Sequence, residues 1–254
     1  TRGRYIAHLG ELRRDFEAAA TAQRVAAAWR DPAPEVLWSV ARDRRRLWER
    51  RPGDPDFLAV RVGLGRVPLE LVPTLAGAAN PMTETDSVCQ AAATHLQRRW
   101  SSIGGQPLAL PLTAIGSLVV RGPRRLALGA TRALVAQAAT LHAPEDVHVA
   151  VATTAARLED WEWCKWLPHA EDVDLADGTG PGRLVAATYE ELDAAVHQEI
   201  AARRGSRAGE TGPHLLVVVD GQSGEARAAR RAEARQSGAT GATSRRTPVR
   251  NRRG

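Results

Sequence analysis

The sequence predicts an α/β fold in which an N-terminal helical stalk or hairpin precedes a mostly parallel sheet flanked by helices. Apolar residues recur at helical spacing over residues 3–50, and the spacing changes to that of strands after Asp56. Farther along, unbroken apolar runs alternate with helical segments as far as Asp220. We therefore expect three parts: a helical stalk over residues 1–52, an α/β domain over residues 53–221 and a disordered Arg-rich tail over residues 222–254.

The first predicted helix, over residues 3–29, carries a narrow apolar seam. Its members recur at alternating spacings of four and three and are Tyr5, Leu9, Leu12, Phe16 and Ala19. This pattern is typical of a helix that packs lengthwise along a partner. The proline-rich run at residues 31–34 ends the helix, because proline cannot donate into the helical ladder. A second helix is expected over residues 34–50, and both a hairpin covering a domain and a membrane-proximal stalk remain open.

The strands and helices of the α/β domain follow in order. Residues 57–63 and 68–72 are predicted to be short strands joined through a glycine-rich turn, and residues 84–100 return to helical spacing. Continuous apolar runs separated by helices then favour a parallel sheet. Its expected strands lie at residues 117–122, 147–151, 183–187 and 214–220, with helices at about 124–141 and 189–203.

The turn after residue 122 is where a phosphate-binding loop would lie in a P-loop-like domain. Gly122 takes the first glycine position of the motif G-x-x-x-x-G-K-[ST]. The second glycine, the lysine and the hydroxyl are replaced by Ala127, Leu128 and Gly129, and Pro123 removes a backbone amide from the cradle. A plain strand-to-helix turn is therefore the favoured interpretation.

Asp220, at the end of the last predicted strand, occupies the place of an acid that orients a magnesium-bound water. Gly221 stands where a catalytic carboxylate would be expected after it. We therefore expect a degenerate, inactive nucleotide site at Gly122 and Asp220, with no catalytic residue, no metal and no cofactor. The chain is expected not to be an enzyme.

The single lysine of the chain lies in a tryptophan-rich run, away from any glycine loop. Because large aromatic side chains dominate interfaces, this run predicts a docking surface whose candidate residues are Trp161, Trp163, Lys165, Trp166 and His169. The alternative, which the sequence favours, is structural packing, with Trp161 and Trp166 in the core and Lys165 over an indole face. Histidines 142, 148 and 169 show no metal-binding spacing.

Charge is concentrated in the tail. The chain carries a formal net charge of +6, while residues 225–254 hold nine arginines against two glutamates, so the rest is close to neutral. We therefore expect no specific nucleic-acid partner, although the tail could bind RNA, DNA or anionic lipid nonspecifically. The two cysteines match no metal spacing, which favours a reducing interior. No apolar run approaches the roughly 20 residues that span a bilayer, so this chain alone is expected to be soluble.

Four separated blocks carry a resemblance to a known family. They are Leu47-Trp48-Glu49-Arg50-Arg51-Pro52, the run from Asp56 to Gly65, the run from Trp161 to His169, and the run from Pro213 to Asp220. In this order they resemble EccC, the FtsK/SpoIIIE-like ATPase of actinobacterial type VII (ESX) secretion systems. The similar region lies between the transmembrane helices and the first canonical motor domain of that family.

The resemblance implies a stalk continuing from the membrane and a degenerate ATPase-like domain, on the cytoplasmic side of the cell membrane. The ATP and magnesium sites of the family belong to motor domains that have no positions here, and the chain begins without methionine, so we expect a piece of a longer protein. Implied partners are other membrane-complex subunits, with self-association through the longer protein. The expected function is a non-catalytic coupling segment in protein export. A nucleotide-responsive or nucleic-acid-binding FtsK-like protein is the alternative.

Overall fold

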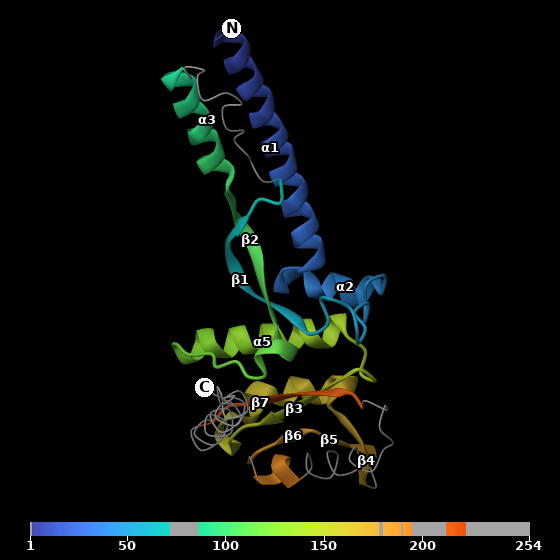
Figure 1. The fold of residues 1–254 in the computed structure, drawn as a ribbon. Coiled ribbons are helices and arrows are strands. Elements are labelled where there is room, and N and C mark those ends of the chain that lie inside the picture. Colours follow the sequence, from blue (N-terminus) through green and yellow to red (C-terminus); the bar gives the residue numbers. More distant parts are fainter. Residues whose placement is uncertain (1, 72–85, 178–179, 189, 195–211, 222–254) are drawn as a thin grey trace, which may run out of the picture. The chain divides into compact units, whose positions relative to one another are not determined.

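The computed structural model describes residues 2–71, 86–177, 180–188, 190–194 and 212–221 (Figure 1). The chain forms two compact units that interleave along the sequence. The first unit comprises Thr1–Arg44, Ala59–Pro111 and Gly122–Gln137, and the second comprises Arg45–Leu58, Leu112–Arg121 and Ala138–Gly254. The predicted division at residues 52 and 221 stays a prediction, and the tail lies outside the described residues.

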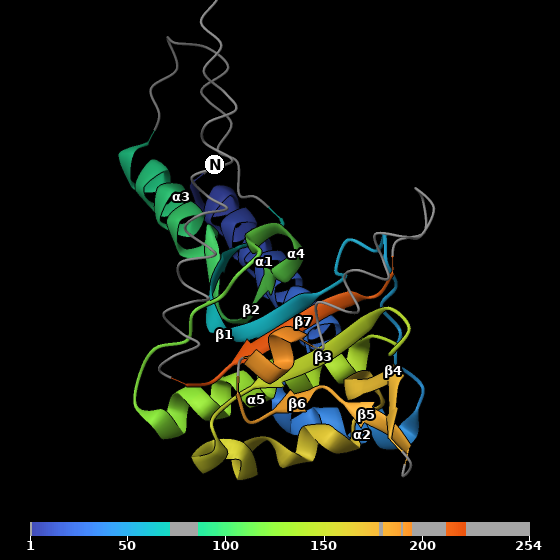
Figure 2. The same cartoon turned by 90° about the horizontal axis from the view of Figure 1, so that it is seen from below.

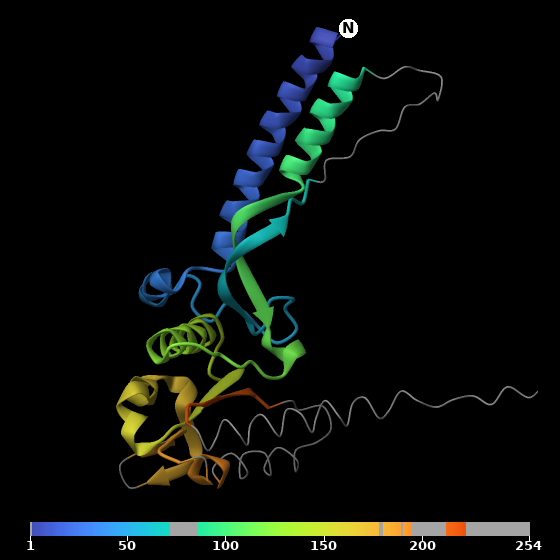
Figure 3. The ribbon, with the colours of Figure 1, turned by 90° about the vertical axis from the view of Figure 1, so that its left-hand side faces the viewer.

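The first unit contains two long helices and a β-ribbon. Helix α1 (Arg2–Arg30) and helix α3 (Ser87–Trp100) lie side by side, as two views show (Figures 1 and 3). Strands β1 (Ala59–Pro68) and β2 (Ser102–Pro111) pair in antiparallel fashion. The buried core of this unit draws on α1, α3, β2 and the residue after β1; its members are Phe16, Ala20, Leu69, Trp100 and Ile103.

Local sequence signals explain where these helices begin and end. Asp86 caps α3, because its carboxylate accepts from the backbone N–H groups of Val88 at 2.9 Å and Cys89 at 3.4 Å. A short 3-10 turn (η1, Pro34–Val36) leads into α2 (Leu37–Asp43), which ends at Arg44 in the left-handed conformation. The second predicted helix is therefore shorter than the expected 34–50.

The second unit is built on a three-stranded parallel sheet (Figure 2). Strand β3 (Val147–Ala152) lies between β6 (Val185–Ala186) and β7 (His214–Val219) and is parallel to both. Other described elements of this unit are α4 (Leu112–Ile115), the 3-10 helices η2 (Ala155–Trp166) and η3 (Pro168–Ala170), and the antiparallel pair β4 (Glu171–Asp177) and β5 (Gly180–Arg183). Helix α5 (Arg124–Leu141) contributes its last residues to this unit.

Two sequence predictions about strands are wrong. The expected turn between strands 57–63 and 68–72 does not exist, because β1 continues through its glycines and pairs with β2, a strand that was not predicted. A Cβ on Gly65 would lie 2.6 Å from Leu108 Cδ1, so this glycine permits close approach of a side chain rather than a turn. The expected strand at 117–122 is irregular instead, with Val119 65% exposed.

The other predicted elements agree with the structure where it describes them. The α/β class and the parallel sheet are confirmed, as are the helices at 3–29, 84–100 and 124–141 and the strands at 147–151 and 214–220. The expected strand at 183–187 is divided between β5 and β6, and only residues 190–194 of the expected helix at 189–203 are described. Within the described residues, no helix is long and apolar enough to cross a membrane.

Candidate functional site

Asp220 lies at the carboxyl end of β7, the edge of a parallel sheet where ligands commonly bind. Its backbone N–H donates to the carbonyl of Ala152, at the end of β3, at 2.8 Å. Its own carbonyl accepts from the hydroxyl of Thr153 at 3.1 Å. These hydrogen bonds fix the backbone of Asp220 beside the end of β3.

Both carboxylate oxygens of Asp220 are used inside the protein. Oδ2 accepts a hydrogen bond from the indole Nε1 of Trp161 at 2.8 Å, and Oδ1 accepts from Nη1 of Arg157 at 3.2 Å. Trp161 is 1% exposed, so its N–H needs an acceptor within the fold. A carboxylate held this way serves as an anchor for η2, with the arginine supplying the positive charge that a cation would otherwise supply.

A side chain at the neighbouring position would press against Thr154. A Cβ added to Gly221 would lie 3.0 Å from the methyl carbon of Thr154, so a glutamate there would require Thr154 to move. Gly122 belongs to the other unit, precedes α5 and has a φ of +150°. The prediction that Gly122 and Asp220 share a degenerate nucleotide site stays a prediction.

The tryptophan-rich run forms η2, and its side chains have different environments. Trp161 is buried, Trp163 is half-buried and Trp166 is 87% exposed, so the expectation that Trp166 fills the core is wrong. The ammonium group of Lys165 lies 3.4 Å from a carboxylate oxygen of Glu162, one turn away. His169 is buried in η3. Of the predicted docking residues, Trp166 is the most accessible.

Sequence reasoning missed a cluster around the carboxyl end of α5. The last carbonyls of a helix have no partner within the helix and must be satisfied elsewhere. Here the backbone N–H of Trp48 donates to the carbonyl of Thr140 at 3.0 Å, and its indole Nε1 donates to the carbonyl of Ala139 at 3.2 Å. The backbone N–H of Arg50 donates to the carbonyl of Leu141 at 2.9 Å. The next carbonyl, of His142, lies 2.8 Å from Nε2 of His169. We call this set the α5 cap.

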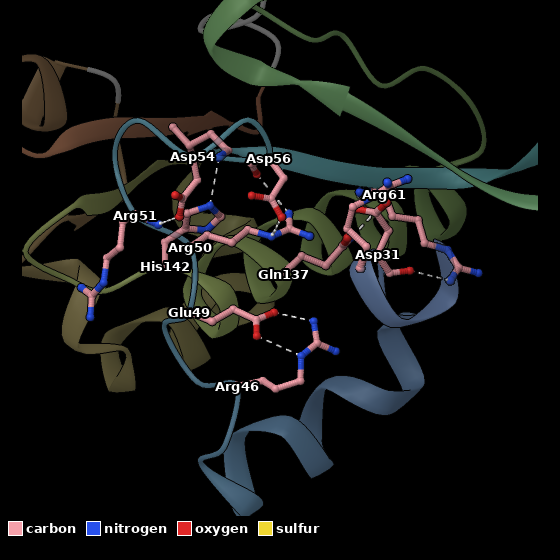
Figure 4. Close-up of polar contacts among 12 residues, drawn as sticks. Asp31, Arg46, Glu49, Arg50, Arg51, Asp54, Asp56, Arg61, Gln137 and His142 are labelled. Carbon is pink, nitrogen blue, oxygen red and sulfur yellow. Dashed lines mark hydrogen bonds and ion pairs between the residues drawn. The ribbon is translucent and has the colours of Figure 1, made fainter. Parts of the chain in front are cut away.

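An ion pair and a tight turn hold the cap segment in shape (Figure 4). Arg50 is 2% exposed; its Nε lies 3.1 Å from Asp56 Oδ2, and its Nη1 donates to the Asp56 carbonyl at 3.3 Å. Between them, the N–H of Arg51 donates to the Asp54 carboxylate at 2.7 Å. Burying a guanidinium costs free energy unless its charge is paired, so the burial of Arg50 depends on the carboxylate of Asp56.

His142, directly after α5, is held as the neutral tautomer with its proton on Nδ1. Nδ1 lies 2.9 Å from the carbonyl of Ala138, which can only accept, and Nε2 accepts from the N–H of Leu58 at 2.9 Å. Burial lowers the pKa of His142 to about 4; the hydrogen bond to Ala138 opposes this effect and the charge of Arg50 adds to it. Protonation would place two N–H groups against each other at Leu58. Burial also lowers the pKa of His169.

In the first unit, a buried glutamine joins α5 to the ribbon (Figure 4). The side chain of Gln137 accepts from the backbone N–H of Arg61 at 2.9 Å and donates to the Arg61 carbonyl at 3.0 Å, as a neighbouring strand would. The guanidinium of Arg61 in turn donates to the carbonyl of Asp31 at 3.1 Å. This contact extends the pairing of β1 at a position where β1 has a bulge.

The predicted stalk seam is divided between the interior of the first unit and its surface. The rings of Phe16 and Trp100 stack with centroids 6.3 Å apart, and Leu12 packs against the same cluster. Leu9 is half-buried and Tyr5 is 38% exposed. Among the described residues, the partner of the carboxyl half of the seam is therefore α3 of the same chain, and its Tyr5 end is more exposed.

Comparison with known proteins connects this geometry to a family, although no family model matches the chain. The chain is 34% identical to the ESX secretion system protein EccC of Thermomonospora curvata over 221 residues, which is 85% of the chain and 16% of that protein. It is 36% identical to the ESX-3 secretion system protein EccC3 of Mycobacterium tuberculosis, over 86% of the chain and 16% of that protein. The chain is a homologue of the EccC proteins. It thus spans about a sixth of the length of these relatives.

The first, third and fourth of the blocks on which the EccC resemblance was based lie in the second unit. Trp48 and Arg50 come from the first block and His169 from the third, and all three satisfy carbonyls at the end of α5. Trp161, also of the third block, binds Asp220, the last residue of the fourth. The blocks are therefore joined by hydrogen bonds as well as by their order in the sequence. Arg157 and His142 lie outside the blocks, and only contact geometry reveals their roles.

Proposed function

We propose that this EccC homologue is a non-catalytic structural and coupling segment of an ESX secretion protein, linking a membrane anchor to motor domains. The observation that carries the proposal is the state of Asp220, whose carboxylate oxygens are bound by Trp161 and Arg157. The sequence adds that leucine and glycine replace the lysine and hydroxyl of a phosphate loop. These features favour an α/β unit that keeps its shape without a nucleotide.

The test of the non-catalytic role combines calorimetry with a turnover assay. We expect no binding of ATP with Mg²⁺ at micromolar concentration and no hydrolysis by the full chain. Arg157→Ala removes the guanidinium that binds Oδ1 of Asp220 and serves as the matched variant, with Arg42→Ala on the first unit as the control. Micromolar binding by the unaltered chain, or hydrolysis that Asp220→Ala abolishes, would refute the proposal.

The coupling role rests on the α5 cap, which ties residues near position 50 to the helix end and to η3. We expect Trp48→Ala, introduced at the matching position of a full-length EccC relative, to lower secretion while ATP hydrolysis by the same protein persists. Trp38→Ala, which removes an indole of the first unit that is 62% exposed, is the control for loss of a tryptophan without loss of the α5 cap. Parallel loss of both activities, or no loss of secretion, would count against coupling through this segment.

A further inference from the structure

Strained backbone conformations are concentrated in one short segment of the chain. Among the described residues, three that are not glycine have a positive φ: Arg44 at 57°, Trp48 at 58° and Leu58 at 52°. Arg44 ends a helix, where this left-handed conformation is common. Large side chains elsewhere rarely adopt it, because it crowds the Cβ atom. Strain of this kind is typical of segments that have two arrangements, so Trp48 and Leu58 need an explanation.

Both strained residues attach this segment to the end of α5. The backbone N–H of Trp48 donates to the carbonyl of Thr140 at 3.0 Å, and the N–H of Leu58 donates to Nε2 of His142 at 2.9 Å. The N–H of Arg50 adds a third bond beside the first. At Trp48 and Leu58 a hydrogen bond is thus made at the cost of a strained backbone. Breaking either bond would relieve that strain, so these attachments are weaker than the same bonds in relaxed backbone.

Between the two attachments, the chain is held in shape by its own contacts. The carbonyl of Arg51 accepts from the N–H of Asp54 at 3.0 Å, and the carbonyl of Asp54 accepts from the N–H of Phe57 at 3.1 Å. The guanidinium of Arg50 pairs with Asp56 within the same stretch. None of these three contacts needs the rest of the second unit. The stretch can therefore leave the unit without losing its own conformation.

We propose that residues 45–58 form a strap that opens from the second unit and closes on it in one piece, while the parallel sheet stays folded. Opening breaks the attachments at Trp48 and Leu58 and relieves the strain at both. The middle of the strap adds an ion pair between Arg51 and Asp146 at 3.3 Å. This contact contributes little, because the Arg51 side chain is 61% exposed.

The closed strap is the main state, because opening takes Phe57 and Leu58 out of an apolar cluster with Val147. The chain enters the strap from residue 44 and leaves it at residue 59, and both of these belong to the first unit. The purpose of the strap rests on the proposed coupling function, since an attachment that can open allows the chain on either side to be tied to the second unit or released from it.

Hydrogen exchange of the full chain at neutral pH, read residue by residue, tests the proposal. We expect the backbone N–H groups of Trp48, Arg50 and Leu58 to share one opening constant. It should exceed that of the β3 groups paired with β7 by at least roughly tenfold. Unequal constants would mean that the strap does not move in one piece, and a smaller excess would mean that it opens only when the unit unfolds. Either result would overturn the proposal.

Glycine and alanine at position 48 measure the strain. Both remove the indole, but glycine adopts a positive φ without strain and alanine does not. The strap should therefore open about threefold less often in Trp48→Gly than in Trp48→Ala. Glu49→Gly and Glu49→Ala are the matched controls, because Glu49 is the next residue of the strap and does not have a positive φ. There glycine should open the strap about threefold more, because it loosens the open chain.

The N–H groups of Arg50 and Leu58 report opening in all four variants, and circular dichroism establishes that each is folded. If a Trp48 variant is not, the exchange pattern of the unaltered chain carries the test. Glycine that opens the strap more than alanine at both positions would show that residue 48 is unstrained, and would overturn the proposal. A secretion assay that refutes the coupling function would leave these exchange rates unchanged, so the two claims fail separately.

Discussion

The two units differ in what they bury. The apolar core of the first unit is built around the stacked rings of Phe16 and Trp100, and the unit also buries the carboxylate of Asp31, which pairs with Arg30. The second unit buries ionisable groups, namely Arg50, His142 and His169, each with a defined hydrogen-bonding or charge partner. Apolar packing is insensitive to proton concentration, whereas a buried neutral histidine is not. We therefore expect truncation of a core side chain to destabilise the first unit, and a fall in pH to destabilise the second.

The largest effect is expected from Phe16→Ala in the first unit. Removing a ring that is 7% exposed and stacked on Trp100 should cost about 4 kcal/mol of unfolding free energy, because it leaves a cavity. Val25→Ala, on the same helix but 67% exposed, is the control. Hydrogen exchange measured by mass spectrometry should show faster exchange in α3 but not in β3 and β7. Equal protection of α3 in both variants would contradict the assignment of this core.

Acidification should lower the stability of the second unit before that of the first. The pKa of His142 is about 4 in the fold and 6.5 outside it, so the unfolded chain binds more protons between these values. The stability contributed by the neutral ring is complete above pH 6.5 and is lost as pH falls toward 4, by about 3 kcal/mol. His169 acts in the same direction. Unfolding followed from pH 7 to pH 4 by hydrogen exchange would measure this loss.

Two variants sharpen that titration. His142→Gln should flatten the pH dependence of the second unit, because the titrating group is gone, while His8→Gln on the exposed surface of α1 should leave it unchanged. A profile that keeps its full slope in His142→Gln would show that another group controls the acid response.

Asp220→Ala should have an intermediate effect. It leaves the buried indole N–H of Trp161 without an acceptor and Arg157 without its anion, which should cost about 2 kcal/mol. Asp220→Asn keeps one acceptor oxygen and should cost less. A double-mutant cycle with Trp161→Phe isolates the pair, and additive losses would mean that the hydrogen bond contributes nothing.

Trp166→Ala should have the smallest effect on stability, less than about 0.5 kcal/mol, because the side chain is 87% exposed. Chemical denaturation beside Trp161→Ala makes the comparison within a single 3-10 helix. A loss for Trp166→Ala as large as that for Trp161→Ala would mean that the indole is covered in solution.

The sequence predicted helices and strands that have a local pattern of apolar residues. It missed those that form only because a distant segment of the chain lies beside them. Helix α5 and strands β3 and β7 were found because their periodicity and apolar runs are local signals. Strand β2 contains Gly104, Gly105 and Pro107, which read as a loop, and it forms because β1 lies beside it. The run at 117–121 shows the reverse case, a strand signal without a neighbouring strand in the described fold.

The candidate site shows the same limit. Asp220 was predicted from a local motif, but its engagement by Arg157 joins residues 63 positions apart, and no spacing rule indicates it. The tryptophan run predicted one surface, whereas a 3-10 helix gives its three indoles three different environments. His142 and Arg50 act through contacts with Leu58, Asp56 and the end of α5, which no local sequence pattern indicates.

The α5 cap also has a kinetic consequence. The bond from the Trp48 indole to Ala139 joins residues 91 positions apart, so forming it requires closure of a long loop. We expect the cap to form after the sheet and to be absent from the folding transition state. Its contribution should then slow unfolding without speeding folding, and Trp48→Phe should move only the unfolding limb of a chevron plot. The segment around residue 50 would thus lengthen the time that the second unit stays folded.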